Sequence, residues 1–375
     1  MSDLSLKQTL SSTTLFKVRL DPRFRASYAS FYIQGLIDLF GRQRISITAQ
    51  GFPDWESGAE RVSFDHYFSF ILEGDTGQVL KVVVDYRDKT NFSVPALDWC
   101  DCYGKVNLKK GSAEFQALSS PLRDKIQPIG PGFGVRVWAL GKSLMTAIHC
   151  LTAARHFDTR PSLRQVASGF HWQIKRPRLA DYDVAPGSRG YVFHASSLYA
   201  SQANGESTNR LRAAFVRAAR QSGAVFEGGL VATKGSHVPN QFRDVMAERY
   251  FPARDYMRRT ERSAIVFSTP AAWGCLGWKL GEYLAMGKAI ISTPIEHDLP
   301  APLRHGEHIH IVRDEPEMLS AVRALLGNED LRLTIAANAR AYYEKYLSPE
   351  RVLERLVSVS SLPALGRLQG ERNAY

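Results

Sequence analysis

The chain has 375 residues, 44% of them hydrophobic, and carries a formal net charge of +11 with a pI of about 9.5. This length allows two cores of ordinary domain size. The sequence has no run of about 18 apolar residues and no apolar N-terminal core, so neither a membrane-spanning helix nor a signal peptide is expected. The four cysteines lack zinc-site or disulfide-framework spacing, which favours reduced thiols and the cytoplasm. The spread of basic residues favours anionic partners, and the absence of zinc-finger, zipper and RNA-recognition patterns argues against nucleic acid.

The first half of the chain predicts an α/β sheet domain with irregular insertions. Short apolar runs predict strands at 15–20, 44–49, 66–72, 82–84 and 102–106, and a helix is expected at 27–40, ending at Gly41. In a doubly wound sheet, the loops at the carboxyl ends of the strands face a cleft. The charged residues of these loops are therefore candidate ligand contacts: Asp21, Arg23, Arg25, Asp85, Arg87 and Asp88.

The middle of the chain predicts a turn, a helix and a connection. Residues 130–134 (GPGFG) predict turns and not a phosphate loop, because no Lys-Ser/Thr pair follows them. A helix is expected at 142–157, with its apolar side formed by Leu144, Ile148, Leu151 and Ala154. Residues 158–190 are rich in Arg, Pro and Gly and contain Phe170 and Trp172. We interpret them as a connection between domains; the alternative is a basic, aromatic edge that rests on a membrane.

The second half begins with a β-α-β unit, which implies a parallel sheet. Strands are expected at 190–195 and 224–226, and the helix between them has Ser207 or Thr208 available as its N-cap. Arg210 lies in its first turn, and Lys234 lies in a later loop; both could reach a phosphate. Further along, a strand at 309–312, a helix capped by Asp314, a helix at 329–346 and a helix restarting at 348 are expected.

Residues 263–300 form the most informative stretch. They predict a strand at 265–267, a Gly-containing turn, a helix and a second strand at 289–291. Gly274, Gly277 and Gly281 allow close approach of the backbone near the helix start, where unpaired N–H groups favour an anion. Lys279 adds positive charge there, and Glu282 can accept hydrogen bonds from neighbouring hydroxyls. A diphosphate beside vicinal hydroxyls is the chemistry of a nucleotide sugar.

The run from Lys279-Leu280 through Glu282-Tyr283-Leu284-Ala285-Met286-Gly287-Lys288 resembles the nucleotide-binding segment of GT-B glycosyltransferases. It is most similar to family 4 (group 1) enzymes of surface polysaccharide synthesis, and the resemblance extends over about residues 190–357. It implies an α/β fold of GT-B architecture, with two Rossmann-like domains facing across a cleft. The implied domains are 1–185, on the acceptor side and including the linker; 186–347, which binds the nucleotide sugar; and 348–375, a helix crossing back to the first domain and a tail.

The resemblance implies a hexosyltransferase that moves a sugar from a nucleotide-diphosphate donor to a glycan or lipid-linked acceptor. In the family, the glutamate matching Glu282 holds the ribose hydroxyls. The other expected donor contacts are Gly277, Lys279, Leu280, Arg210 and Lys234. No metal or cofactor is expected beyond the nucleotide-sugar co-substrate, because the helix dipole and basic side chains neutralise the diphosphate. The inner face of a membrane is an alternative location to the cytoplasm.

One departure leaves the donor sugar and the stereochemistry open. Many family members carry two glutamates separated by seven residues, and the position of the first is Gly274 here. An inverting enzyme needs a base near the acceptor hydroxyl, for which the candidates are Asp88, Asp85, Asp21 and His66; a retaining enzyme needs none. The competing interpretations are a non-catalytic nucleotide-binding module and a GT-B-like sugar-nucleotide epimerase.

Overall fold

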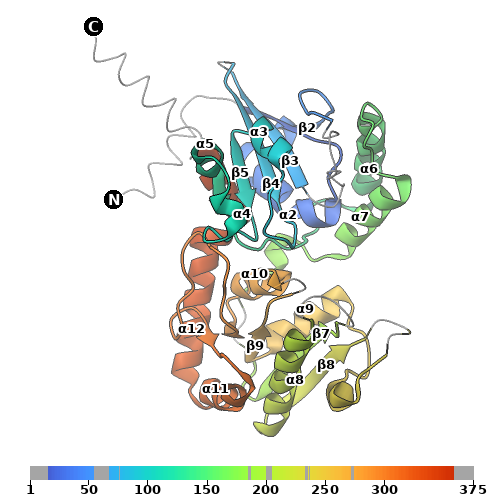
Figure 1. Ribbon diagram of the computed structural model, residues 1–375. Helices are drawn as coiled ribbons and strands as arrows, with labels where there is room; N and C mark the ends of the chain where they lie inside the picture. Colours follow the sequence, from blue (N-terminus) through green and yellow to red (C-terminus); the bar gives the residue numbers. More distant parts are fainter. Residues whose placement is uncertain are drawn as a thin grey trace.

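The computed structural model describes residues 16–54, 67–75, 77–184, 187–199, 205–232, 235, 237–271 and 274–358. Figure 1 shows two α/β halves, one above the other, which we call the first and second domains. They are two Rossmann-like domains facing each other, so the α/β class and the GT-B architecture expected from the sequence are confirmed. His66, Lys234, the boundary at 185/186 and the tail at 359–375 lie outside the described residues.

The sheet of the first domain has six strands in the order β2-β1-β3-β4-β5-β6. β3 runs antiparallel to both of its neighbours, whereas β1 pairs with β2, and β4 with β5 and β6, in parallel. The strand bounds are β1 Phe16–Leu20, β2 Ile45–Ile47, β3 Tyr67–Gly74, β4 Val79–Asp85, β5 Cys102–Lys105 and β6 Ile126–Pro128. The central strands are buried almost throughout because helices cover both faces of the sheet.

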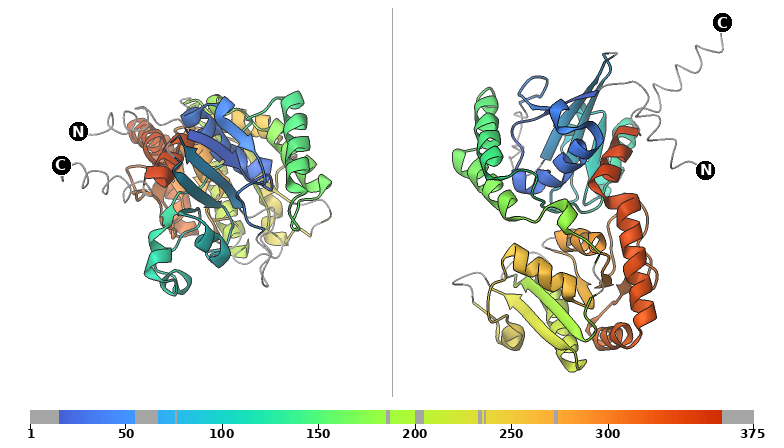
Figure 2. Two further views of the ribbon diagram at one scale, coloured as in Figure 1. Left: turned by 90° about the horizontal axis from the view of Figure 1, so that it is seen from above. Right: turned by 180° about the vertical axis from the view of Figure 1, so that it is seen from behind.

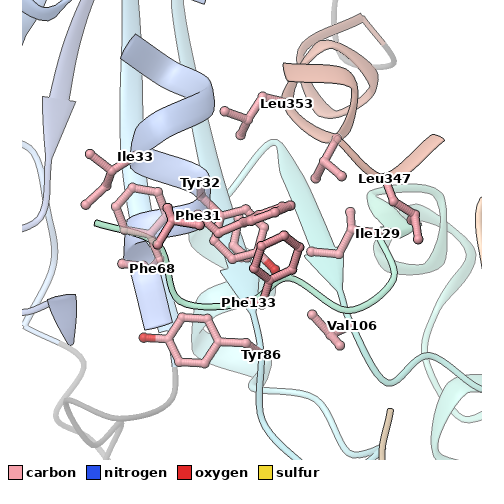
Figure 3. Packing of buried hydrophobic residues seen from close by; sticks show 14 of the residues in the cluster. Phe31, Tyr32, Ile33, Phe68, Tyr86, Val106, Ile129, Phe133, Leu347 and Leu353 are labelled. Atoms are coloured by element: carbon pink, nitrogen blue, oxygen red, sulfur yellow. The ribbon is translucent and has the colours of Figure 1, made fainter. Parts of the chain in front are cut away.

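Helix α2 (Ala26–Phe40) covers one face of this sheet, and three short helices cover the other: α3 Val94–Trp99, α4 Ala113–Gln116 and α5 Ser120–Asp124. Phe31 and Tyr32 of α2 pack around Phe68 and Phe133 (Figure 3). The C-terminal helix, residues 349–358, lies on the same cluster. A Cβ added at Gly35 would lie 2.6 Å from a backbone oxygen of this helix, so the close packing of α2 and the C-terminal helix requires glycine.

All strands of the second domain are parallel. They are β7 Tyr191–Ser197, β8 Val225–Val231, β9 Ile265–Ser268, β10 Ala289–Ser292 and β11 His310–Ile311. Ser263 joins β7 to β9, because its Oγ accepts the N–H of Phe193 at 2.8 Å and Ala264 N donates to Tyr191 O at 2.8 Å. A parallel bridge between Leu230 and Met246 extends the sheet beyond β8. The resulting order is that of a dinucleotide-binding sheet, whose direction of winding switches between β7 and β9.

Within the described part of the chain, five helices surround this sheet (Figures 1 and 2). They are α8 Gly205–Gln221, α9 Ala253–Arg262, α10 Trp278–Ala285, α11 Glu315–Gly327 and α12 Glu329–Tyr342, the last running into a π-helical turn at Tyr343–Leu347. Short 3-10 turns lie at Arg42–Arg44, Leu179–Asp181 and Asn240–Val245. Asp314 caps α11 as expected, accepting the N–H of Glu317 at 3.1 Å.

Three local predictions were wrong. Residues in the expected connection form helix α7 (Leu163–Lys175), which begins with a capping box between Ser162 and Gln165. Helix α6 (Leu140–Ala154) buries small side chains, Ala147 and Cys150 among them, whereas the expected buried residues Leu144 and Ile148 face outward. Helix α8 already begins at Gly205, so neither Ser207 nor Thr208 is its N-cap.

Candidate functional site

A pocket of about 410 Å³, the strand-end pocket, lies where β9 and β10 end in the second domain. Its walls come from the residues directly after these two strands, from the first turn of α8 and from the start of α10. It therefore occupies the crevice outside the carboxyl ends of a parallel sheet, where α/β proteins bind nucleotides. Of the expected donor contacts, Gly277 and Leu280 line it.

Hydroxyl groups dominate the polar lining of the strand-end pocket: Ser207, Thr208, Ser268, Thr269, Ser292 and Thr293. The Oγ1 atom of Thr293 is buried and has no hydrogen-bond partner among the described residues. Such an atom carries a desolvation cost that a bound ligand can remove. The ionisable side chains of the lining are Glu296, His297 and Arg313. Burial lowers the pKa of His297 to about 4, so this imidazole is neutral at pH 7.

The turn before α10 explains why glycine stands where many family members have a glutamate. Gly274 lines the strand-end pocket with φ at +74°, a conformation that L side chains rarely adopt. Gly277 is the N-cap of α10 and has no side chain that could cap the helix. No N-cap side chain therefore accepts a hydrogen bond from the first N–H groups of α10 at the pocket wall. A glutamate at 274 would be strained in this turn.

The charged residues of α10 lie behind the pocket wall. Glu282 is buried, accepts a hydrogen bond from Tyr182 Oη at 3.4 Å and lies 3.7 Å from Arg176 Nη1. Burial raises its pKa, while Arg176 and Lys279 oppose this rise. Lys279 donates to the carbonyl of Ala195, and burial, assisted by the charge of Arg212, lowers its pKa to about 7. Neither residue is among those that line the strand-end pocket.

Two of the arginines of α8, Arg210 and Arg212, differ in their surroundings. Arg210 is 57% exposed, and its Nε lies 3.8 Å from Glu315 Oε1, on the side of α11. Arg212 is buried and donates from Nη1 to Ser197 O at 2.6 Å, at the carboxyl end of β7. Its Nε has no partner among the described residues. Arg212 and Lys279 therefore both bind backbone carbonyls near the carboxyl end of β7, and Arg210 is an outward-facing side chain.

A second pocket of about 550 Å³, the interdomain pocket, is lined by both domains. It is rich in aromatic rings: Tyr28, Tyr32, Tyr86, Trp172, Tyr199 and Trp278. The buried hydroxyls of Ser27 and Tyr32 in its lining have no hydrogen-bond partner among the described residues. Leu276 and Gly277 line both pockets, so the two adjoin at the turn before α10.

Two first-domain side chains hold this shared turn. Asn107 accepts the N–H of Leu276 at its Oδ1 at 2.8 Å and donates from Nδ2 to Arg87 O at 2.8 Å. Asp88, which lines the interdomain pocket, forms a hydrogen bond with the thiol of Cys275; burial and this carboxylate raise the thiol pKa. Of the candidate bases, Asp88 thus lies beside the junction of the two pockets.

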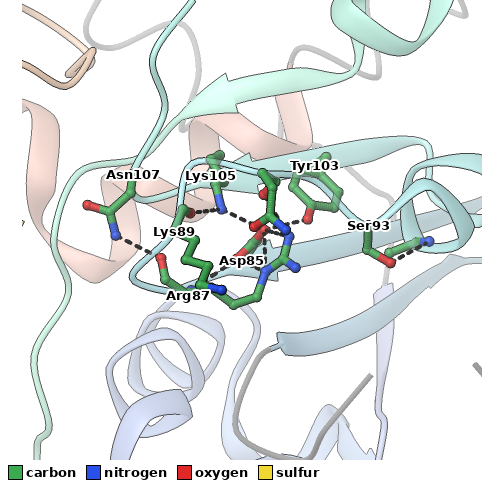
Figure 4. A network of polar contacts seen from close by, with 9 residues as sticks. Asp85, Arg87, Lys89, Ser93, Tyr103, Lys105 and Asn107 are labelled. Carbon is green, nitrogen blue, oxygen red and sulfur yellow. Dashed lines mark hydrogen bonds and ion pairs between the residues drawn. The ribbon is translucent and has the colours of Figure 1, made fainter. Parts of the chain in front are cut away.

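The other candidate carboxylates are engaged inside the first domain. Asp85 accepts hydrogen bonds from Arg87 at 2.8 Å, Lys105 at 2.9 Å and Tyr103 at 2.5 Å (Figure 4). Burial alone would raise its pKa, but Lys105 and Arg87 hold it below the ordinary value. Asp21 is paired with Arg23 at 2.7 Å. Neither carboxylate is among the residues that line these two pockets, and both are engaged with basic side chains of the first domain.

A family model described as glycosyl transferase-like matches residues 212–358, from α8 to the C-terminal helix. Over this part, which is less than half of the chain, the sequence is therefore similar to glycosyl transferases, as the run from Lys279 to Lys288 predicted. The search of curated proteins returned no match.

The search of solved structures found glycosyltransferases, at low sequence identity and low TM-score. A glycosyltransferase from Rickettsia africae ESF-5 has 14% identity and a TM-score of 0.42, with 72% of this chain and 67% of that chain covered. Anabaena Alr3699/HepE, solved with UDP-glucose, has 12% identity and a TM-score of 0.37, with 71% and 66% covered. WaaG, a glycosyltransferase involved in lipopolysaccharide biosynthesis, has 13% identity and a TM-score of 0.36, with 68% and 62% covered.

Proposed function

We propose that the chain is a glycosyltransferase that moves a hexose from a nucleotide-diphosphate donor to a glycan or lipid-linked acceptor of a surface polysaccharide. The observation that carries this proposal is the junction of two pockets at Leu276 and Gly277. A donor in the strand-end pocket would present its sugar at this junction, where an acceptor in the interdomain pocket could reach it. The proposed domains follow the same division, with the acceptor side in residues 1–185 and the donor side in 186–347.

The strand-end pocket suits a nucleoside diphosphate in size and chemistry. Its volume of about 410 Å³ lies within the range of roughly 300–1,000 Å³ that is usual for small-molecule sites. Its hydroxyls match the ribose and base, and the starts of α8 and α10 favour the negative diphosphate. We propose that these helix starts, with Arg212 and Lys279 near the end of β7, stabilise the leaving group in place of a metal ion. Glu282 would then accept hydrogen bonds from the ribose hydroxyls, or it would hold Arg176 in position.

The interdomain pocket suits a carbohydrate acceptor. Aromatic rings pack against the apolar faces of sugars, and the unpartnered hydroxyls of Ser27 and Tyr32 can hydrogen-bond to sugar hydroxyls. Asp88 is the carboxylate in this pocket, so it is the proposed base if the configuration is inverted. The proposed partners also include an anionic membrane surface. Within the described part of the chain, no helix has the length and apolarity needed to span a bilayer.

Thr293→Val tests the donor site with little change in shape. In the free protein this substitution removes a buried hydroxyl without a described partner, so the melting temperature should stay the same or rise. With UDP, GDP, ADP and CMP as probes, a ligand at a hundred times its Kd should stabilise the wild type by about 2.7 kcal/mol. The shift with the preferred nucleotide should shrink in Thr293→Val.

Arg313→Ala provides a second arm, with Arg189→Ala as the matched exposed control outside the pocket. Removing Arg313 should weaken nucleotide binding by up to about fivefold, the range for an exposed ion pair, and Arg189→Ala should have no effect. The proposal fails if no nucleotide shifts the wild type at millimolar concentration. It also fails if Thr293→Val binds as tightly as the wild type. Donor hydrolysis without acceptor separates an enzyme from a binding module.

A further inference from the structure

The outward face of α6 exposes an unusual number of large apolar side chains. Leu140, Leu144, Met145 and Ile148 are 72%, 63%, 72% and 53% exposed. Leu163 and Trp172 of α7 are also exposed, so α6 and α7 carry six of the twelve exposed large hydrophobic residues within the described part of the chain. Residues at intervals of four lie on one side of a helix. The four exposed side chains of α6 therefore form one apolar face.

This face is opposite to the surface that α6 packs against the domain. The buried side of α6 consists of Ser143, Ala147, Cys150 and Ala154 and contacts α7, which in turn packs on α2. In Figures 1 and 2, α6 stands at the outer edge of the first domain with α7 beside it. Contiguous exposed apolar patches mark interaction surfaces in soluble proteins. The larger side chains of α6 are thus available to a partner.

Positive charge surrounds the apolar face. Residues 140–175 contain five exposed cations and a single acid, Asp158. The cations are Lys142, Arg155, Arg160, Arg164 and Lys175. A groove of about 540 Å³ beside α6 is lined by Arg155, His149 and His156, whose nitrogen donors suit a phosphate group. A second copy of the chain would bring two positive rims together, whereas anionic headgroups would neutralise them.

We infer that the outward face of α6 is the surface by which the chain rests on an anionic lipid bilayer. The helix has 15 residues and a length of only ~22 Å, less than the roughly 30 Å of a bilayer core. It therefore lies in the plane of the interface, with the apolar side chains among the acyl chains and the cations at the headgroups. An anionic bilayer can therefore bury the apolar face in its acyl chains and pair its headgroups with the surrounding cations at the same time.

The position of α7 connects this surface to the proposed acceptor site. Trp172 of α7, and Arg176 just beyond the helix, line the interdomain pocket. A bilayer under α6 would therefore lie on the same side of the first domain as α7, from which a lipid-linked acceptor could enter. The membrane partner rests on the proposed function, but the docking surface itself does not depend on sugar transfer. Nucleotide binding and vesicle binding can accordingly fail separately.

Vesicle flotation of the full chain tests the inference. The vesicles are phosphatidylcholine alone, or phosphatidylcholine with about 30 mol% phosphatidylglycerol, at ~0.1 M and ~1 M salt. The wild type should float with the anionic vesicles at low salt.

Leu144→Ser with Ile148→Ser should abolish flotation, while the exposed controls Val225→Ser and Leu333→Ser should not. Lys142→Glu with Arg155→Glu should weaken binding, by about fivefold or more for each cation lost, and Arg258→Glu should have no effect.

Each variant is first checked for an unchanged melting temperature and an unchanged nucleotide-induced shift, because all the replaced residues are exposed and lie outside the strand-end pocket. Flotation of the α6 variants at wild-type levels would overturn the inference. A second result would also overturn it: the wild type binds no vesicle and sediments as a dimer, and the double variant Leu144→Ser with Ile148→Ser sediments as a monomer. The apolar face of α6 would then be covered by a second copy of the chain.

Discussion

The first and second domains each bury a group of charges, and the two groups differ in how completely they are paired. In the first domain, the fully buried carboxylate of Asp85 accepts short hydrogen bonds from Arg87, Tyr103 and Lys105. In the second domain, Glu282 has contacts of 3.4 and 3.7 Å, and Arg212 keeps an unpartnered Nε among the described residues. Buried polar groups are normally satisfied. The complete group is structural, and the incomplete one is suited to receive a ligand.

The two groups are linked through the interface between the domains. The backbone carbonyl of Arg87 accepts from Asn107, and Asn107 accepts from Leu276 in the turn that borders both pockets. Lys109 and Glu296 add an ion pair at 2.6 Å on the other side of the strand-end pocket. The fully paired charge group around Asp85 is thus linked, through Arg87 and Asn107, to the turn that precedes the incompletely paired group of the second domain.

Asp85→Asn should give the largest effect, because it leaves Lys105 buried without its carboxylate. Breaking one partner of a buried ion pair costs about 3–5 kcal/mol, so urea denaturation should show a loss of this size in the free energy of unfolding. Asp98→Asn, at an exposed position of the same domain, is the control and should cost little. Adding Lys105→Met to Asp85→Asn should restore part of the loss. A loss below about 1 kcal/mol would mean that the Asp85 group is not structural.

Local motifs were predictable from the sequence, and contacts between distant segments were not. The turn, α10 and β10 follow one another within 40 residues, and the types and spacing of their residues predicted this order of elements. Asn107 is 169 residues away from Leu276, so no local pattern connects them. Arg313 was missed although it follows β11, and the rule that ligands bind at carboxyl ends of strands would have indicated it.

The errors at α6 and α7 have different physical causes. Helical periodicity identifies an apolar side but does not say whether the protein covers it, so Leu144 and Ile148 were expected inside. Helix α7 is flanked by Arg and Pro, which suggested a connection, yet Ser162 and Gln165 have the spacing of a capping box. Because Leu144 and Ile148 were expected to be buried, the exposed apolar face of α6 was not predicted from the sequence.

Glu282→Gln should give the next largest effect, and on binding more than on stability. Its hydrogen-bond partners are distant, so the melting temperature should change little. If Glu282 contacts the donor ribose, calorimetry should show a loss of about 10- to 100-fold in nucleotide affinity, equivalent to a charged hydrogen bond. If it only positions Arg176, nucleotide affinity should persist and the KM for acceptor should rise. Glu344→Gln, in an exposed ion pair, is the control.

Lys279→Met should give the smallest effect, visible as a change in pH dependence. Burial lowers the pKa of Lys279 to about 7, while the unfolded chain keeps the ordinary value near 10.5. Between these values the unfolded state binds more protons, so the free energy of unfolding rises with pH. Lys279→Met should remove about 2 kcal/mol of this rise between about pH 7 and 9. Lys288, whose pKa burial lowers to about 8, provides the matched control. Lys288→Met should also flatten the profile, but only Lys279→Met should weaken nucleotide binding. Equal nucleotide affinity in both variants would remove Lys279 from the proposed diphosphate site.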